Sequence, residues 1–204
     1  IGLIGLIGGA AYAWFREPPR PLVLAYYYPW YFKDDWSRHG HVESPALGLY
    51  GTDDPATAVA HIRLARRYGI GGFLLSWHGE GTITDQHAKA GLLKAHNLSQ
   101  IRFAMYYETL GQLDAADGTE DSLVDFSKAG VVAKLTADLA ALKRDYFSHP
   151  AYLHIDGKPV VGIYVARAFR HFTPEHIAAV EAALGTDLYL IADTAFIDTE
   201  SRPE

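Results

Sequence analysis

The sequence has no cysteine, a single methionine (Met105) and a single asparagine (Asn97). The absence of cysteine excludes a disulfide framework, a thiolate metal site and a cysteine nucleophile, although it leaves the cellular compartment open. An excess of positive charge is also lacking, because the net charge is −6, so nothing supports a nucleic-acid or anionic-membrane partner. Since the 204 residues begin with isoleucine, we expect the chain to be part of a longer reading frame.

Residues 1–15 lack charge altogether and consist mainly of apolar residues and glycine. They are fewer than the roughly 20 residues that a transmembrane helix needs, but an upstream segment would supply the difference. The proline-rich stretch that ends at Pro21 is typical of a stiff spacer. We therefore expect residues 1–21 to be a membrane anchor or a signal-peptide remnant with its linker, which predicts a secreted or membrane-anchored, extracytoplasmic protein. The alternative is a glycine-rich segment that is buried in the fold.

Five short runs of apolar and aromatic residues follow, and each is typical of a buried strand. They cover residues 22–28, 70–77, 101–107, 158–165 and 188–192. Amphipathic patterns between them predict helices. We expect Asp54 and Thr173 to cap the first and last of these helices, and Gly69 and Gly185 to end them. A weaker helix is expected within residues 85–96. The clearest helix has an apolar stripe of Val132, Leu135, Leu139, Leu142 and Tyr146.

The alternation of strands and helices predicts a parallel sheet with helical crossovers. An Asp156-Gly157 turn adds a small hairpin before the fourth strand. Two architectures fit this order: an open doubly wound sheet and a (β/α)8 barrel. The nucleotide-binding open sheet needs a glycine-rich turn after its first strand, but that position holds Tyr28-Pro29-Trp30-Tyr31. We therefore predict an α/β fold of the (β/α)8 TIM-barrel type, in which residues 22–204 supply about five βα units.

In barrels of this type the active site follows the C-terminal ends of the strands. Those positions hold polar side chains and many aromatic rings. Seven aromatic residues lie from Tyr26 to Trp36 alone. Aromatic rings cover the C–H faces of a sugar while polar groups bind its hydroxyls, so the pattern predicts a glycan ligand. The strand-end residues expected to bind it are Tyr28, Trp30, Trp77, His78, Tyr164 and Asp193.

Two glutamates and three histidines have structural alternatives. Glu108 could tie neighbouring backbone, and Glu80, between two glycines, could belong to the exposed surface. His39 and His41, together with His78, raise the question of a metal. A His-Gly-His pair without carboxylates in a fixed geometry chelates poorly. We therefore predict no metal site and no cofactor.

Several motifs occur in the order of the predicted strands, between residues 22 and 165. They are Tyr26-Tyr-Tyr-Pro-Trp-Tyr31, Gly48-Leu-Tyr-Gly-Thr-Asp53, His61, Phe73-Leu-Leu-Ser-Trp77, His149-Pro-Ala-Tyr152, Asp156-Gly-Lys-Pro159 and Gly162-Ile-Tyr164. Together they resemble the endo-α-mannosidases of glycoside hydrolase family 99 and their wider relatives. The resemblance implies a barrel that cleaves α-mannosides inside a glycan chain with retention of configuration. By position, Tyr28 or Trp30, Trp77 and Tyr164 would line its sugar subsites. We expect a monomer.

The sequence departs from this family at the catalytic motif. The two working glutamates of the family lie in an Asn-Glu-Trp-x-Glu stretch on a later strand, whereas Asn97 is followed by Leu98. Glycoside hydrolysis needs two carboxyl groups across the scissile bond, and Glu108 and Glu80 are only reserve catalytic candidates. We therefore expect the catalytic pair beyond Glu204, and this chain alone to be inactive. The alternatives are a non-catalytic carbohydrate-binding barrel and a metal-dependent polysaccharide-modifying hydrolase.

Overall fold

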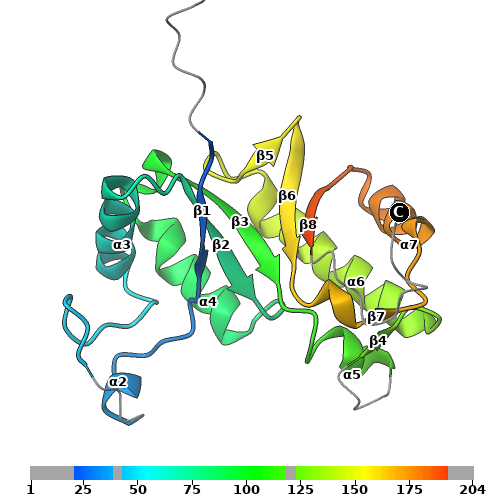
Figure 1. Cartoon of the computed structure of the whole chain (residues 1–204), viewed down its shortest axis with the longest axis horizontal. Helices are drawn as coiled ribbons and strands as arrows, with labels where there is room; N and C mark the ends of the chain where they lie inside the picture. Colours follow the sequence, from blue (N-terminus) through cyan, green and yellow to red (C-terminus); the bar gives the residue numbers. More distant parts are fainter. Residues whose placement is uncertain (1–20, 39–42, 118–122, 193–204) are drawn as a thin grey trace, which may run out of the picture.

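A computed structural model describes residues 21–38, 43–117 and 123–192. Its centre is a sheet of five parallel strands that lie side by side in chain order (Figure 1). The strands are β1 (Leu24–Tyr27), β2 (Gly72–Trp77), β3 (Arg102–Tyr107), β6 (Lys158–Ile163) and β8 (Tyr189–Ala192). The predicted parallel α/β arrangement is therefore confirmed. Within the described ranges, the outer edges of β1 and β8 pair with no further strand, and closure of a barrel stays a prediction.

The predicted hairpin before the fourth parallel strand is also present. The short strand β5 (His154–Ile155) pairs antiparallel with the start of β6. In the turn between these two strands, the φ values of Asp156 and Gly157 are 51° and 77°. Positive φ at both central residues is the requirement of a type I′ turn, and it explains why an Asp-Gly pair connects these strands.

The first two crossovers contain α3 (Pro55–Arg67) and α4 (Ile83–Ala90). Asp54 caps α3 as predicted, because its carboxylate accepts a hydrogen bond of 2.8 Å from the backbone N–H of Ala56. The second helix begins earlier than expected and ends at Gly91, where a Cβ atom would lie 2.1 Å from the carbonyl oxygen of Thr52. This close approach requires glycine. The chain continues through two 3₁₀ turns, η1 (Leu92–Lys94) and η2 (Leu98–Gln100).

The later crossovers contain α6 (Ala129–Leu142), which continues as the π-turn η3 (Lys143–Phe147), and α7 (Pro174–Leu184). The predicted stripe on α6 and η3 is buried at Leu135, Leu139, Leu142 and Tyr146, while Val132 is partly buried. Thr173 and Gly185 bound α7 as expected. The loops also contain α2 (Asp35–Arg38), α5 (Leu113–Asp117), η4 (Ala166–Ala168) and a two-stranded sheet of β4 (Val124–Asp125) and β7 (Phe169–Arg170).

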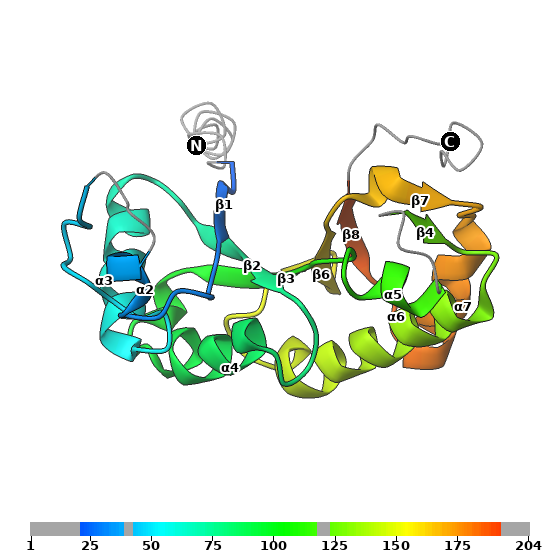
Figure 2. The ribbon, with the colours of Figure 1, turned by 90° about the horizontal axis from the view of Figure 1, so that it is seen from below.

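The two faces of the parallel sheet differ in what covers them. Figure 2 shows α4 and α6 along one face, whereas no helix of the described residues lies across the middle of the other. Successive strand residues point to opposite faces, so Tyr27, Trp77 and Tyr107 reach the helices. Tyr26 and Tyr106 point the other way, and their rings lie 4.9 Å apart. We call this second side the helix-free face.

No helix among the described residues has the length and apolar character to cross a membrane. Residues 1–20, where an anchor or signal-peptide core was expected, lie outside the described ranges. The predicted extracytoplasmic location therefore stays a prediction.

Candidate functional site

A serine and a glutamate meet on the helix-free face, at the C-terminal ends of β2 and β3. Ser76 Oγ donates a hydrogen bond of 2.5 Å to Glu108 Oε1, and both side chains are buried. The backbone N–H of Glu108 donates to the carbonyl oxygen of Trp77 at 2.9 Å, which extends the pairing of the two strands. Glu108 is thus a carboxylate held at a fixed point of the strand ends, where barrel enzymes place their chemistry.

Aromatic rings from three strand ends lie on the same face of the sheet as this pair. The ring centroids of Tyr26 and Tyr28 lie 6.4 Å apart, those of Tyr28 and Trp30 4.6 Å, and those of Tyr106 and Tyr164 5.8 Å. Tyr26 and Tyr28 are 56% and 42% exposed, so a ligand has access to them. We call Tyr26, Tyr28, Trp30, Tyr106 and Tyr164 the ring cluster.

A glycine makes room for one of these rings. A Cβ atom on Gly162 would lie 2.3 Å from the ring of Tyr106. Gly162 pairs with Tyr106 across β3 and β6, so the missing side chain allows the ring to lie flat over the sheet. The position of Tyr106 therefore depends on glycine at this position.

Glu108 and the ring cluster also interact electrostatically. Partial burial, followed by the negative charge of Glu108, raises the pKa of the Tyr28 hydroxyl above its ordinary value. The neighbouring hydroxyls of Tyr26 and Tyr164 act in the same direction. Tyr28 therefore keeps its proton throughout the neutral range and is available as a hydrogen-bond donor beside a carboxylate acceptor.

His78 also lies at the C-terminal edge of the sheet, where it directly follows β2. Its ring lies edge-on to Trp30, with centroids 5.9 Å apart, and its backbone N–H donates to Thr84 Oγ1 at 3.0 Å. The Nδ1 atom of His78 is buried and has no hydrogen-bond partner among the described residues. An unpaired buried polar atom costs about 1–3 kcal/mol, and this nitrogen has almost no exposed surface through which a ligand could satisfy it.

Trp77 corrects one of our predictions. It is fully buried, its Nε1 atom donates to Asp85 Oδ1 at 3.0 Å, and its ring packs against Tyr107. It follows Ser76 directly in a strand, so its side chain points to the opposite face, toward the helices. The prediction that Trp77 lines a sugar-binding surface was therefore wrong.

Glu80 is corrected as a catalytic candidate. It lies in the loop after β2, is largely exposed, and accepts a hydrogen bond of 2.5 Å from Arg144 Nη2. The alternative of an exposed surface glutamate therefore describes Glu80 better than a catalytic role.

Three other residues named in the sequence predictions, Asp193, His39 and His41, lie outside the described ranges. Within those ranges no group of three or more histidine, cysteine, aspartate or glutamate side chains comes together as a metal site would require. Tyr28, Trp30, His78, Tyr164 and Glu108 do lie near one another at the strand ends.

Sequence reasoning missed three members of the site: Tyr26, Ser76 and Tyr106. The available signal was the two-residue period of the strands, which places Tyr26 on the same face as Tyr28, and Tyr106 on the same face as Glu108. To use that signal, one must also know the register between neighbouring strands. The structure shows this register, in which Ser76 pairs with Tyr106.

Three solved structures with a similar fold are of glycoside hydrolases or a glycoside hydrolase-like protein. A family 99 endo-α-mannosidase from Bacteroides thetaiotaomicron, in complex with bis-tris-propane, matches with a TM-score of 0.60 and 20% identity over 84% of this chain and 52% of that one. A second structure of the endo-α-mannosidase from this organism gives a TM-score of 0.59 and 17% identity over 83% and 54%. A glycoside hydrolase-like protein gives 0.55 and 23% over 84% and 51%.

These matches establish a glycoside hydrolase family 99-like fold for the described part of the chain. The chain spans about half the length of the structures that it matches. No protein-family model matches the sequence, and no curated protein matches it.

Proposed function

We propose that this chain forms the glycan-binding face of a glycoside hydrolase-like protein that acts on α-mannoside-containing or related glycans. The observation that carries the proposal is the ring cluster on the same face of the sheet as the buried Ser76–Glu108 pair. It lies at the C-terminal ends of parallel strands, where enzymes of this fold class bind their substrates. The fold shared with endo-α-mannosidases supports the same substrate class.

The chemistry of the face suits a sugar ring. The exposed parts of the Tyr26 and Tyr28 rings offer apolar surface to the C–H groups of a pyranose. Tyr28 supplies a hydroxyl donor and Glu108 a fixed carboxylate acceptor. A sugar needs both kinds of partner, because each of its hydroxyls donates and accepts.

Hydrolysis needs two carboxyl groups, about 5–5.5 Å apart in a retaining enzyme. On the helix-free face Glu108 has a serine as its partner, while Glu80 is paired with Arg144. We propose endo-acting, retaining cleavage by the whole protein, with the two working glutamates supplied from outside residues 1–204. In this proposal Glu108 binds sugar hydroxyls.

Isothermal titration calorimetry with α-linked manno-oligosaccharides tests binding by the 204-residue chain. Tyr28→Ala should weaken the affinity about tenfold, which corresponds to about 1.4 kcal/mol. The control is Lys94→Ala, which removes an exposed side chain on η1. Equal losses in both variants, or no binding by the unmodified chain, would contradict the proposal.

A carbohydrate-binding protein without catalysis is the second candidate. It is favoured by the surroundings of the two reserve glutamates, since Glu108 is buried and hydrogen-bonded to Ser76 while Glu80 is paired with Arg144. An assay of the whole protein for new reducing ends in an α-mannan separates the two candidates. Saturable binding without cleavage would support the binding protein, and cleavage would support the hydrolase.

A further inference from the structure

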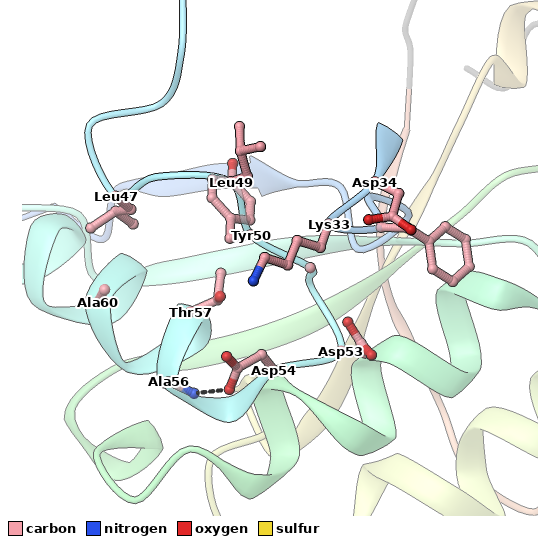
Figure 3. A pocket seen from close by; sticks show the side chains of 12 residues that line it. Lys33, Asp34, Leu47, Leu49, Tyr50, Asp53, Asp54, Ala56, Thr57 and Ala60 are labelled. Atoms are coloured by element: carbon pink, nitrogen blue, oxygen red, sulfur yellow. Dashed lines mark hydrogen bonds between the residues drawn. The ribbon is translucent and has the colours of Figure 1, made fainter. Parts of the chain in front are cut away.

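A cavity separate from the Ser76–Glu108 pair lies between the segment that follows β1 and the N-terminal turn of α3 (Figure 3). Its volume is about 570 Å³, within the range of about 300–1,000 Å³ that is usual for small-molecule sites. Figure 3 shows Lys33, Leu49 and Tyr50 around it, with Asp53 and Asp54 near the start of the helix. We call it the α3 cavity.

The walls of the α3 cavity hold polar groups that the protein leaves unpaired. Lys33 forms no ion pair within the described ranges, although three carboxylates (Asp34, Asp53 and Asp54) line the same cavity. The side chain of Asp53 likewise has no hydrogen-bond partner among these residues. Gly51 gives it room, because a Cβ atom there would lie 2.3 Å from Asp53 Oδ1. A donor and an acceptor are thus both available to a ligand.

These groups limit the chemistry of the ligand. An anion would face three carboxylates and a single ammonium group, and the carboxylates would repel it. A purely apolar ligand would leave charged groups desolvated without partners. A neutral ring with several hydroxyls satisfies Lys33 and Asp53 together, and its C–H face can lie against the exposed side chains of Leu47 and Leu49.

The α3 cavity is connected to the ring cluster by aromatic packing. The centroids of Trp30 and Tyr31 lie 6.3 Å apart, those of Tyr31 and Trp36 5.2 Å, and those of Trp36 and Tyr50 4.9 Å. Trp36 Nε1 also donates a hydrogen bond of 2.7 Å to the carbonyl oxygen of Tyr50. A wall of the cavity is therefore held in a fixed position relative to the sugar-binding rings.

We infer that the α3 cavity is a distal sugar-binding site, which takes one unit of the same glycan whose other units contact the ring cluster. The inference rests on the proposed function, and it adds a preference for long glycans over short ones. A glycan that reaches both sites gains from the second contact at high effective concentration. A disaccharide bound at the ring cluster would make no second contact and would gain nothing from the α3 cavity.

Calorimetry with α-linked mannobiose and mannohexaose tests this inference on the 204-residue chain. Lys33→Ala and Asp53→Asn change exposed side chains, and each should weaken mannohexaose binding about tenfold while leaving mannobiose binding unchanged. Tyr28→Ala should weaken both. The control is Lys94→Ala, which removes an exposed lysine on η1 and should change neither affinity.

The outcomes separate the two proposals. If Tyr28→Ala weakens binding but Lys33→Ala and Asp53→Asn bind mannohexaose as the unmodified chain does, the distal site is wrong and the proposed function stands. If Lys33→Ala weakens both saccharides equally, the cavity does not act as a distal site. If the unmodified chain binds neither saccharide, the proposed function and the inference both fail.

Discussion

The indole nitrogen of Trp77 donates a hydrogen bond to Asp85 Oδ1 at 3.0 Å, and the bond holds the last residue of β2 against α4. The same oxygen accepts a hydrogen bond from the hydroxyl of Tyr146, and Asp85 Oδ2 accepts one of 2.9 Å from the backbone N–H of Gly81. These contacts lie behind the ring cluster, on the side of the helices. Trp77 therefore supports the strand end that carries Ser76 and His78.

Replacement of Trp77 should affect stability first. Trp77→Ala empties a buried volume and should lower the free energy of unfolding by about 3–5 kcal/mol. Trp77→Phe should cost less, about 1–3 kcal/mol, chiefly because Asp85 loses a buried donor. Urea unfolding followed by circular dichroism measures both, with the exposed Tyr68→Ala as control. An unchanged unfolding midpoint in Trp77→Ala would show that the residue has no supporting role.

Asp85 should make stability depend on pH in the acidic range. Burial raises its pKa, but the hydrogen bonds from Tyr146, Trp77 and Gly81 outweigh burial, so the net pKa lies below the ordinary value. A carboxyl whose folded pKa is depressed stabilises the fold above its unfolded pKa of about 4. That stability is lost as the pH falls through the folded pKa.

Thermal unfolding between about pH 6 and about pH 2 measures this effect. Asp85→Asn should be less stable than the unmodified chain near neutral pH, and the difference should shrink as the pH falls. The exposed Ile83→Ala changes no titratable group and serves as control, with a stability difference that should not vary with pH. A constant difference between Asp85→Asn and the unmodified chain at every pH would contradict the assignment.

Gly162 should be required because of the ring of Tyr106. Gly162→Ala places a methyl group where the ring lies, and should cost about 1–3 kcal/mol through overpacking. In a Tyr106→Ala background the same substitution should cost little, so the two sites should show a clear coupling energy. A double-mutant cycle in urea measures it. Equal costs in both backgrounds would mean that the ring is not what Gly162 accommodates.

Ser76 should matter through Glu108. Ser76→Ala leaves a buried carboxylate without its hydroxyl donor, and should lower stability by about 1–3 kcal/mol and weaken glycan binding. Ser76→Thr keeps the hydroxyl and serves as the matched variant, which should retain most of both properties. Unfolding curves and calorimetry on the two variants decide the matter. If Ser76→Ala binds a manno-oligosaccharide as tightly as the unmodified chain, the pair has no part in recognition.

Local features of the sequence predicted much of the fold. Asp54 caps α3, Gly185 ends α7, and Asp156-Gly157 forms the hairpin turn. Caps and turns depend on residues close together in the chain, since their hydrogen bonds and φ values are local. The apolar strands were likewise recognisable, because burial on a parallel sheet leaves continuous apolar runs.

The make-up of the site was only partly predictable. Tyr28, Trp30 and His78 were identified from their place after a strand. Trp77 was misassigned, because the face that a side chain takes at the end of a strand changes with a shift of one residue. Glu80 was left open between a reserve catalytic role and the exposed surface, and its partner, Arg144, is 64 residues away in the chain. No local sequence pattern predicts a contact between residues so far apart in the chain.

The sequence by itself thus determined the order of strands and helices, the helix caps and turns, and the enrichment of rings after the first strand. The tertiary structure decided which of those rings share a surface, that Ser76 and not Trp77 faces Glu108, and that Lys33 and Asp53 line one cavity without pairing. The reason is physical. Backbone geometry follows from neighbours in the chain, whereas strand register and helix packing decide which side chains from distant segments meet.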